Sequence, residues 1–385
     1  MEFGLTEEQK LIQQTAHEFA QEKLAPLAAE YDRTEEFTAP QAKMLAEMGF
    51  LGMMVPEEYG GSGLDTVSYV IAMEEVARAC ASTSVTMTVQ NSLVCWPIDF
   101  FGNDAQKREY LVPLAKGETL GCFGLTEPVA GSDAASMATT AQEDGDSYIV
   151  NGSKIFISNG GVAQVAIVWA QTDRELRHKG ISCFIIEANS PGYTIGAEEK
   201  KLGIRGSNTT ELHFENCRVP RENMLGNPGE GFKIAMQTLD GGRIGVASQA
   251  VGIGQASLDA ALKYSHERQA FGKPLAEIQA IQLKIADMAM EVQASRLLTY
   301  HAAWMKDQGG RFTKQAAMAK LHASETATKA AHMALQVHGG YGYLKDFPVE
   351  RFYRDARITE IYEGTSEIQR IVISGAELKE SGAGA

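Results

Sequence analysis

The sequence contains few cysteines and no long apolar run, and both absences exclude classes of protein. Its five cysteines are scattered, and no Cys-x-x-Cys or Cys/His spacing typical of a zinc site occurs. We therefore expect reduced, buried thiols and no bound metal. No apolar stretch approaches the roughly 18–20 residues that a membrane-spanning helix needs, so no membrane insertion is expected. The cysteines are Cys80, Cys95, Cys122, Cys183 and Cys217.

The chain also has fewer basic than acidic residues. The chain of 385 residues has 35 Lys and Arg against 49 Asp and Glu, a formal net charge of −14. General nucleic-acid binding needs concentrated Lys and Arg to neutralise phosphates, so no nucleic-acid partner is expected. An anionic ligand would have to be held by local basic groups. Residues 1–10 lack a basic segment followed by an apolar one, so we expect a cytoplasmic protein of bacterial type without a targeting segment.

Several nucleotide-binding and catalytic motifs are missing as well. There is no Walker A sequence, no HExxH and no GxSxG, and neither glycine-rich stretch completes a GxGxxG fingerprint after a strand. These gaps disfavour a P-loop NTPase, a Rossmann dehydrogenase, a metalloprotease and a serine hydrolase. The first stretch, with Gly252 and Gly254, predicts close helix packing. The second, at 339–342, follows a helix end and should expose backbone amides to an anionic or polar ligand.

What the sequence does contain is three regions of different periodicity. Residues 1–120 follow helical spacing and open on a capping box at Thr6. Residues 121–230 carry short β-type runs with no helix-length segments between them, which predicts a mostly antiparallel sheet. Within that region, Asn151-Gly152 predicts a hairpin turn.

The third region, residues 231–385, returns to long segments rich in Ala, Leu, Met, Gln and Glu, which favour helices. Several such segments with short breaks predict an antiparallel bundle. The tail from 381 to 385 is made of small residues and should fray. The segments are 256–264, 278–302 and 313–337.

One short stretch near the C-terminus carries a candidate catalytic group. Ser366 and Gln369 form a capping box, so a helix should begin near Ser366, with Glu363 in the loop just before it. A carboxylate at that place has two interpretations. It can simply complement the helix dipole. It can also act as a general base, because Tyr362 would exclude water and raise the carboxylate pKa, while Gly364 lets a substrate approach the backbone.

Six motifs, in their order and spacing, resemble those of the acyl-CoA dehydrogenase family, and the resemblance runs from Leu5 to about Leu378. It is strongest for the short-chain (butyryl-CoA) branch, through LDGGRIGVA at 239–247. It implies an α+β fold with an N-terminal α-helical domain, a middle antiparallel β-barrel-like domain and a C-terminal four-helix bundle, in agreement with the three regions. The motifs are FGLTEPVAGSD (123–133), KIFISNG (154–160), KLGIRGS (201–207), ERQAFGK (267–273), QVHGG (336–340) and YEGT (362–365).

The resemblance implies FAD as the cofactor. Relatives usually have Trp and Thr where this chain has Phe156 and Ser158. Phe156 can still stack on the flavin and Ser158 still has a hydroxyl, so we expect an altered flavin environment rather than lost binding. The matching positions that would contact FAD, some of them on the neighbouring subunit's cofactor, are Phe123, Leu125, Thr126, Ser132, Phe156, Ile157, Ser158, Arg268, Gln279, Gln336, Gly339, Gly340, Thr365 and Glu367.

The resemblance also implies a reaction. Glu363 would remove the α proton of an acyl-CoA while the β hydrogen leaves as hydride to the flavin, giving a trans-2-enoyl-CoA. The Glu363 amide and a flavin hydroxyl would stabilise the thioester enolate. Electrons would pass to an electron-transfer flavoprotein, and family members are usually homotetramers built as dimers of dimers. The residues that would meet the substrate are Ser132, Asp240, Arg243 and Gly364.

One feature narrows the choice of catalytic base, a second narrows the class of substrate, and three alternative functions stay open. Some relatives place the base near Gly241 and Gly242, where glycine cannot act, which leaves Glu363. No Lys or Arg occurs between Arg78 and Lys107, where the family lines its acyl pocket, so a neutral acyl tail is favoured. The alternatives are a branched short-chain acyl-CoA dehydrogenase, an acyl-CoA oxidase and a non-catalytic flavin- or CoA-binding scaffold.

Overall fold

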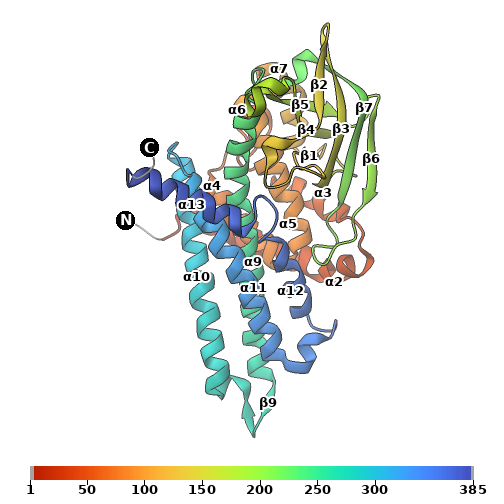
Figure 1. The fold of residues 1–385 in the computed structure, drawn as a ribbon. Helices are drawn as coiled ribbons and strands as arrows, with labels where there is room; N and C mark the ends of the chain where they lie inside the picture. Colours follow the sequence, from red (N-terminus) through yellow and green to blue (C-terminus); the bar gives the residue numbers. More distant parts are fainter. Residues whose placement is uncertain (1–3, 383–385) are drawn as a thin grey trace.

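The computed structural model describes residues 4–382 and contains the three regions that the sequence predicts (Figure 1). In the first, the capping box is present, with the Thr6 hydroxyl accepting from the Gln9 N–H. Short 3-10 and π-helical turns, labelled η, join its helices. The elements are α1 (Glu7–Phe19), η1 (Ala20–Leu24), α2 (Ala25–Thr34), α3 (Ala39–Glu47), η2 (Glu57–Tyr59), α4 (Thr66–Ala79), α5 (Ala81–Thr88), η3 (Val89–Cys95), α6 (Trp96–Phe101), α7 (Asp104–Gln106), η4 (Lys107–Leu111) and α8 (Val112–Ala115).

The middle region is an eight-stranded sheet in the order β6-β7-β3-β2-β4-β5-β8, with β1 beside β4. Most neighbours are antiparallel, as predicted, whereas β1 and β2 each pair with β4 in parallel. The elements are β1 (Gly121–Gly124), η5 (Ala134–Ser136), β2 (Thr140–Asp144), β3 (Ser147–Ser158), β4 (Val165–Gln171), η6 (Arg174–Gly180), β5 (Ile181–Glu187), β6 (Tyr193–Glu198), β7 (Thr209–Pro220), η7 (Arg221–Asn223) and β8 (Met224–Leu225).

The hairpin turn predicted at Asn151-Gly152 is wrong, because β3 continues through both residues. The register of β3 against β7 shifts between Val150 and Gly152, which marks a bulge. Glycine is required there since a Cβ would lie 2.7 Å from the Cα of Thr139. The actual turn joins β2 to β3 through Gly145-Asp146. The pairing of β3 with a strand on each side therefore outweighs the local turn preference of Asn151-Gly152.

The two faces of the sheet bury different cores, because side chains alternate along each strand. On β4, Ile167 and Trp169 face the helices and join the large core that those helices share. Ala166 and Val168 face the separate core inside the sheet region. The indole N–H of Trp169 donates to the carbonyl of Gly231 at 2.7 Å, so the sheet is fastened to the start of the C-terminal region.

The C-terminal region is a helical bundle in which α9 runs from the sheet region to the opposite end of the molecule (Figure 1). All five cysteines of the chain are free and buried, as expected. Within residues 4–382, no helix is long and apolar enough to cross a membrane. Of the tail predicted to fray, residues 383–385 lie outside the described range. The elements are α9 (Gly231–Glu267), β9 (Gln269–Ala270), β10 (Lys273–Pro274), η8 (Leu275–Glu277), α10 (Gln279–Asp307), α11 (Thr313–His338), η9 (Gly339–Tyr343), α12 (Val349–Ile358) and α13 (Ser366–Glu380).

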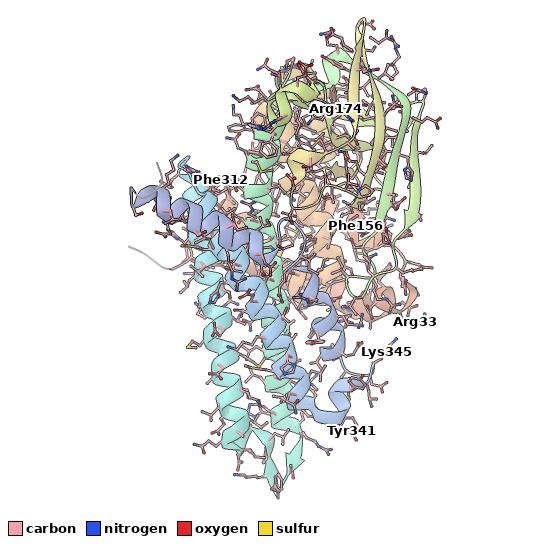
Figure 2. All side chains as sticks on the ribbon, viewed as in Figure 1. Arg33, Phe156, Arg174, Phe312, Tyr341 and Lys345 are labelled. Atoms are coloured by element: carbon pink, nitrogen blue, oxygen red, sulfur yellow. The ribbon has the colours of Figure 1, made fainter. Side chains whose placement is uncertain are left out.

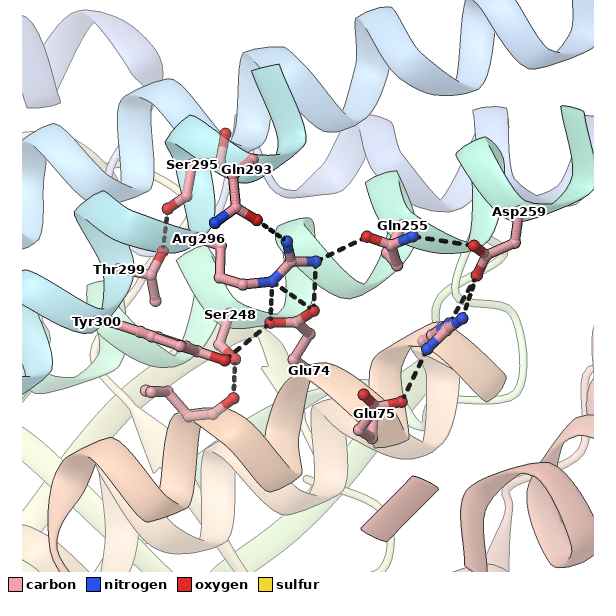
Figure 3. Close-up of polar contacts among 12 residues, drawn as sticks. Glu74, Glu75, Ser248, Gln255, Asp259, Gln293, Ser295, Arg296, Thr299 and Tyr300 are labelled. Atoms are coloured by element: carbon pink, nitrogen blue, oxygen red, sulfur yellow. Dashed lines mark hydrogen bonds and ion pairs between the residues drawn. The ribbon is translucent and has the colours of Figure 1, made fainter. Parts of the chain in front are cut away.

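A polar network fixes α9 against α4 and α10 (Figure 3). Arg296 of α10 donates from Nη2 to Glu74 of α4 and to Gln255 of α9, both at 2.7 Å. The close packing predicted for Gly252 is confirmed, because a Cβ there would overlap the Glu74 carbonyl and lie 2.8 Å from the Ala77 Cβ. The network thus fixes the position of α9, the helix that carries Gly242 and Arg243.

Candidate active site

Glu363 lies in the turn between α12 and α13, with its carboxylate directed at α9. Its φ is +53° and that of Gly364 is +96°, and a non-glycine residue keeps such a conformation only where its surroundings hold it. Its Oε2 is buried and has no hydrogen-bond partner among residues 4–382. Glycine at 242 leaves room for this atom, because a Cβ there would overlap Oε2 and lie 2.8 Å from Leu93 Cδ2. The arrangement offers a buried carboxylate oxygen that is available to take a proton.

Hydrogen bonds from two helices hold this turn. On one side, the Tyr362 hydroxyl donates to Gln249 Oε1 on α9. Gln249 is fully buried and donates in turn to Ser84 Oγ at 2.9 Å. On the other side, the Gln369 amide of α13 donates to the Gly364 carbonyl at 2.9 Å. The left-handed turn is therefore determined by contacts outside itself.

The capping box predicted at Ser366 and Gln369 is wrong by one residue, although α13 does begin at Ser366. The N-cap is Thr365, whose hydroxyl accepts from the Ile368 N–H at 3.4 Å. The sequence presents two neighbouring hydroxyls and does not distinguish them. The Gln369 amide decides the matter, because it is directed at the Glu363 turn rather than back at the cap.

The electrostatic setting of Glu363 suits proton transfer. Burial raises the pKa of its carboxyl to about 7, while the positive charges of Lys320 and Arg243 act in the opposite direction. A base whose pKa lies near the working pH is efficient in accepting and releasing a proton. The alternative role, complementing the dipole of α13, does not explain why the carboxylate lies over α9. The acidic residue in the first turn of α13 is Glu367.

Of the four predicted substrate residues, Gly364 and Arg243 lie near this carboxylate, and Asp240 is paired with Arg243. Arg243 and Asp240 of α9 are buried and form an ion pair at 2.7 Å, and Asp240 also accepts from the Thr313 hydroxyl at 2.6 Å. Gly364 is part of the Glu363 turn. The fourth, Ser132, is exposed on the loop after β1. The ion pair limits the freedom of Arg243 and leaves its Nε without a partner in the described part of the chain.

The predicted flavin contacts of the middle region lie near β1 and β3. Phe123 packs on Trp169 with ring centroids 4.5 Å apart, and Phe156 is 62% exposed at a φ of +58°. An outward-facing aromatic ring fits the flat flavin, and the partly exposed Thr126 and Ser158 add hydroxyls beside it. The side chains of two other predicted contacts face a core instead, leaving backbone atoms for a ligand; they are Leu125 and Ile157.

A second set of predicted FAD contacts lies at the far end of the bundle. Arg268, Gly339, Gly340 and Tyr341 line a hollow of about 510 Å³, with the exposed Gln336 beside it in sequence. Figure 2 shows Tyr341 well separated from Phe156 on the sheet. Within one subunit, the predicted FAD contacts near β1 and β3 therefore lie apart from those at the end of the bundle. Gln279, at the start of α10, follows the strand pair at that same end, whereas Thr365 and Glu367 lie beside Glu363.

Sequence reasoning missed two buried lysines. Lys154 of β3 is fully buried and pairs with Glu127 at 2.6 Å, while also donating to the Leu125 carbonyl at 3.3 Å. This pair ties the loop after β1 to the sheet. Lys320 of α11 is also fully buried. A signal for it existed, since Lys320 interrupts a run of small residues that repeats at helical spacing, with Ala316 among them.

Comparison with known proteins places the chain in a family. The acyl-CoA dehydrogenase N-terminal, middle and C-terminal domain models match residues 6–118, 122–217 and 229–378. The mouse mitochondrial short-chain specific acyl-CoA dehydrogenase is 54% identical, and the match covers 97% of this chain and 91% of that protein.

Solved structures agree. Butyryl-CoA dehydrogenase from Megasphaera elsdenii has a TM-score of 0.97 at 48% identity, covering 98% of this chain and all of that one. A chain from a study of the electron transferring flavoprotein of Acidaminococcus fermentans has a TM-score of 0.97 at 50% identity, with the same coverage. With its three domains matched in order, this chain belongs to the acyl-CoA dehydrogenase family, whose members are FAD-dependent oxidoreductases.

Proposed function

We propose that this chain dehydrogenates short, straight acyl-CoA thioesters, with butyryl-CoA preferred, and that Glu363 is the base. The observation that carries the proposal is the buried Oε2 of Glu363, which has no hydrogen-bond donor among residues 4–382 and lies where Gly242 leaves room for it. Similarity to a short-chain specific enzyme and to a butyryl-CoA dehydrogenase supports the choice of substrate. A neutral acyl tail also agrees with the lack of Lys and Arg between residues 78 and 107.

The residues then act as follows. Glu363 accepts the α proton of the acyl group, and its backbone N–H donates to the thioester carbonyl, where negative charge develops. Arg243, held by Asp240, supplies positive charge nearby. Tyr362 fills the space beside the base and helps to exclude water. Bound FAD supplies the acceptor for the β hydride. The product is a trans-2-enoyl-CoA.

The raised pKa of Glu363 predicts how activity depends on pH. The carboxylate form is required, so kcat/KM for butyryl-CoA should fall about tenfold per pH unit below pH 7 and level off above it. This fall on the acidic side of the pH profile is its acidic limb. With a solvated Glu as base, the limb would be centred near the ordinary pKa of about 4.3. Steady-state rates between pH 5 and 9 with an artificial electron acceptor measure the limb. A profile that stays nearly level down to pH 5 would contradict the assignment of the buried Glu363 as base.

A buried hydroxyl cluster limits the space beyond the base. The Tyr69 hydroxyl lies 3.1 Å from both Thr88 Oγ1 and Ser92 Oγ, and all three residues are buried. One helical turn after Gly242, the chain has Gly245, where a Cβ would overlap the Thr88 hydroxyl and lie 2.8 Å from that of Tyr69. We assign this cluster as the wall that restricts acyl length.

Anaerobic flavin reduction with straight thioesters from C4 to C16, and with isobutyryl- and isovaleryl-CoA, tests the proposed substrate. Butyryl-CoA should give the highest kcat/KM. Tyr69→Leu, which shortens the wall, should raise the octanoyl-to-butyryl ratio by about tenfold or more, since each methylene accommodated is worth about 1–3 kcal/mol. Tyr69→Phe removes only the hydroxyl and is the matched control, which should keep the short-chain preference. Preference of the unmodified protein for a branched thioester would favour the branched-chain alternative.

The split FAD contacts support a subunit-shared cofactor. Arg268, Gly339 and Gly340 line one hollow with Tyr341, which is well separated from Phe156 in Figure 2. We propose that they reach the FAD of a neighbouring subunit. Helix α10 also exposes an apolar residue at every seventh position, a pattern typical of helices that pack against another copy. These residues are Leu283, Met290, Leu297 and Trp304. We propose a homotetramer built as a dimer of dimers.

An electron-transfer flavoprotein is the proposed acceptor of the electrons, because a similar solved chain comes from a study of such a protein. Two alternatives predict distinct outcomes, one in air and one in the anaerobic assay. Stoichiometric peroxide in air would favour an oxidase. FAD-containing protein that no thioester bleaches would favour a non-catalytic scaffold.

A further inference from the structure

Lys320 is a buried cation whose one hydrogen-bond acceptor, among residues 4–382, is the carbonyl of Gly364. The distance from Nζ to this oxygen is 2.7 Å, and the side chain is 0% exposed. Its neighbours on the same face of α11 are alanines, Ala316, Ala323 and Ala327, all buried. Within the described chain, no carboxylate lies within ion-pair distance of the Lys320 ammonium. Burying an ammonium without a paired charge costs several kcal/mol, so this lysine is not explained by packing.

The position of the accepted carbonyl suggests what the lysine does. Gly364 follows Glu363, and this peptide carbonyl closes the left-handed turn. A neutral donor, the Gln369 amide, already reaches the same oxygen at 2.9 Å. The Gly364 carbonyl would therefore keep a hydrogen-bond donor even without Lys320. What Lys320 adds is a positive charge one residue away from an ionisable carboxylate.

We infer that Lys320 is the positioning residue of the base: it fixes the Glu363–Gly364 turn through the Gly364 carbonyl and holds Glu363 in its ionised form. The inference rests on the proposed function of Glu363. Lys320 itself lies in none of the six motifs. Burial lowers the pKa of Lys320 to about 8, so its charge persists at neutral pH.

Other charged groups near Glu363 do not replace Lys320. Arg243 also faces it from α9, but Arg243 is paired with Asp240 at 2.7 Å and acts on the Glu363 carboxylate less than Lys320 does. Tyr69 on α4 and Tyr362 in the turn have pKa values raised by burial, so both stay neutral near pH 7. The remaining acids are Glu360, which is paired with Arg357, and Glu367, which is on the surface of α13. Lys320 is thus the cation near Glu363 that has no counter-ion in contact, within the described residues.

The decisive variant is Lys320→Met in the FAD-loaded protein, compared with Gln369→Met. Both remove one donor from the Gly364 carbonyl, but only the first removes charge. Without the ammonium, the carboxylate loses stabilisation and its pKa rises. Lys320→Met should therefore move the acidic limb of kcat/KM upward by at least about one pH unit, which lowers the ionised fraction at pH 7 about fivefold. Gln369→Met should lower kcat while leaving the limb in place.

The outcomes separate this inference from the proposed function. If no acyl-CoA bleaches the unmodified protein, the proposed function fails before any variant is made. If the unmodified protein is active and the limb of Lys320→Met is unshifted, Lys320 is structural and the inference fails. Lys320→Gln, which keeps a donor but no charge, should give the same upward shift and is measured if the Met variant loses FAD. If neither variant folds, Lys320 is a determinant of the fold and the inference is overturned.

Discussion

Glu363→Gln is expected to keep FAD and to lose reduction by butyryl-CoA. The amide has the shape of the carboxyl, so the turn held by Gln249 and Gln369 should persist. It cannot accept the α proton, because its oxygen is far less basic than a carboxylate with a pKa of about 7. General-base contributions are about 10²–10⁴-fold, and Glu363 is the sole base that we assign, so the loss should reach the upper end.

Stopped-flow mixing with butyryl-CoA, monitored at the yellow flavin band without oxygen, measures this effect. The ratio of flavin to protein absorbance in the variant shows whether the cofactor is retained. Retained colour with bleaching at close to the unmodified rate would remove Glu363 as the base. Glu377→Gln serves as a control for charge, because Glu377 is exposed on α13 and is not among the predicted cofactor or substrate contacts.

Gly242→Ala should cost activity without costing stability. The added Cβ would overlap Glu363 Oε2 and lie 2.8 Å from Leu93 Cδ2. Both atoms are at the far ends of flexible side chains that can move aside, so the fold is expected to accommodate the methyl group. Alanine is also a better helix former than glycine by about 1 kcal/mol. The base, however, is displaced from the position that the α proton must reach. A displacement of about 1 Å can reduce the rate about 100-fold, and we expect a loss of that size in kcat/KM.

Gly241→Ala is the matched control for this substitution. It lies on the same turn of α9 and gains the same helix preference, but a Cβ there meets only Lys306 Nζ at 3.7 Å, an ordinary contact. Thermal denaturation of both variants should show no loss of Tm, whereas only Gly242→Ala should lose activity. Equal activity in the two variants would mean that the Glu363 carboxylate does not need its position beside Gly242 for the reaction.

Local sequence signals were reliable where short-range contacts decide the structure. The capping box at Thr6, the strands of the middle region and the long C-terminal helices all follow from periodicity and capping. They failed where distant segments compete. The turn signal at Asn151-Gly152 is overridden because β3 pairs with β2 and β7. The cap of α13 moves to Thr365 because Gln369 binds the turn before it.

The sequence by itself determined the family, the three-region order and Glu363 as a candidate base, since each depends on residue types at fixed spacing along the chain. Only the tertiary structure decided what makes that glutamate suited to the proposed role of base. Its burial, the room left by Gly242 and the charge of Lys320 come from three different elements. Desolvation and Coulomb interaction depend on distances in space. Residues 121 and 43 positions before Glu363 therefore act on it in a way that no local pattern reports.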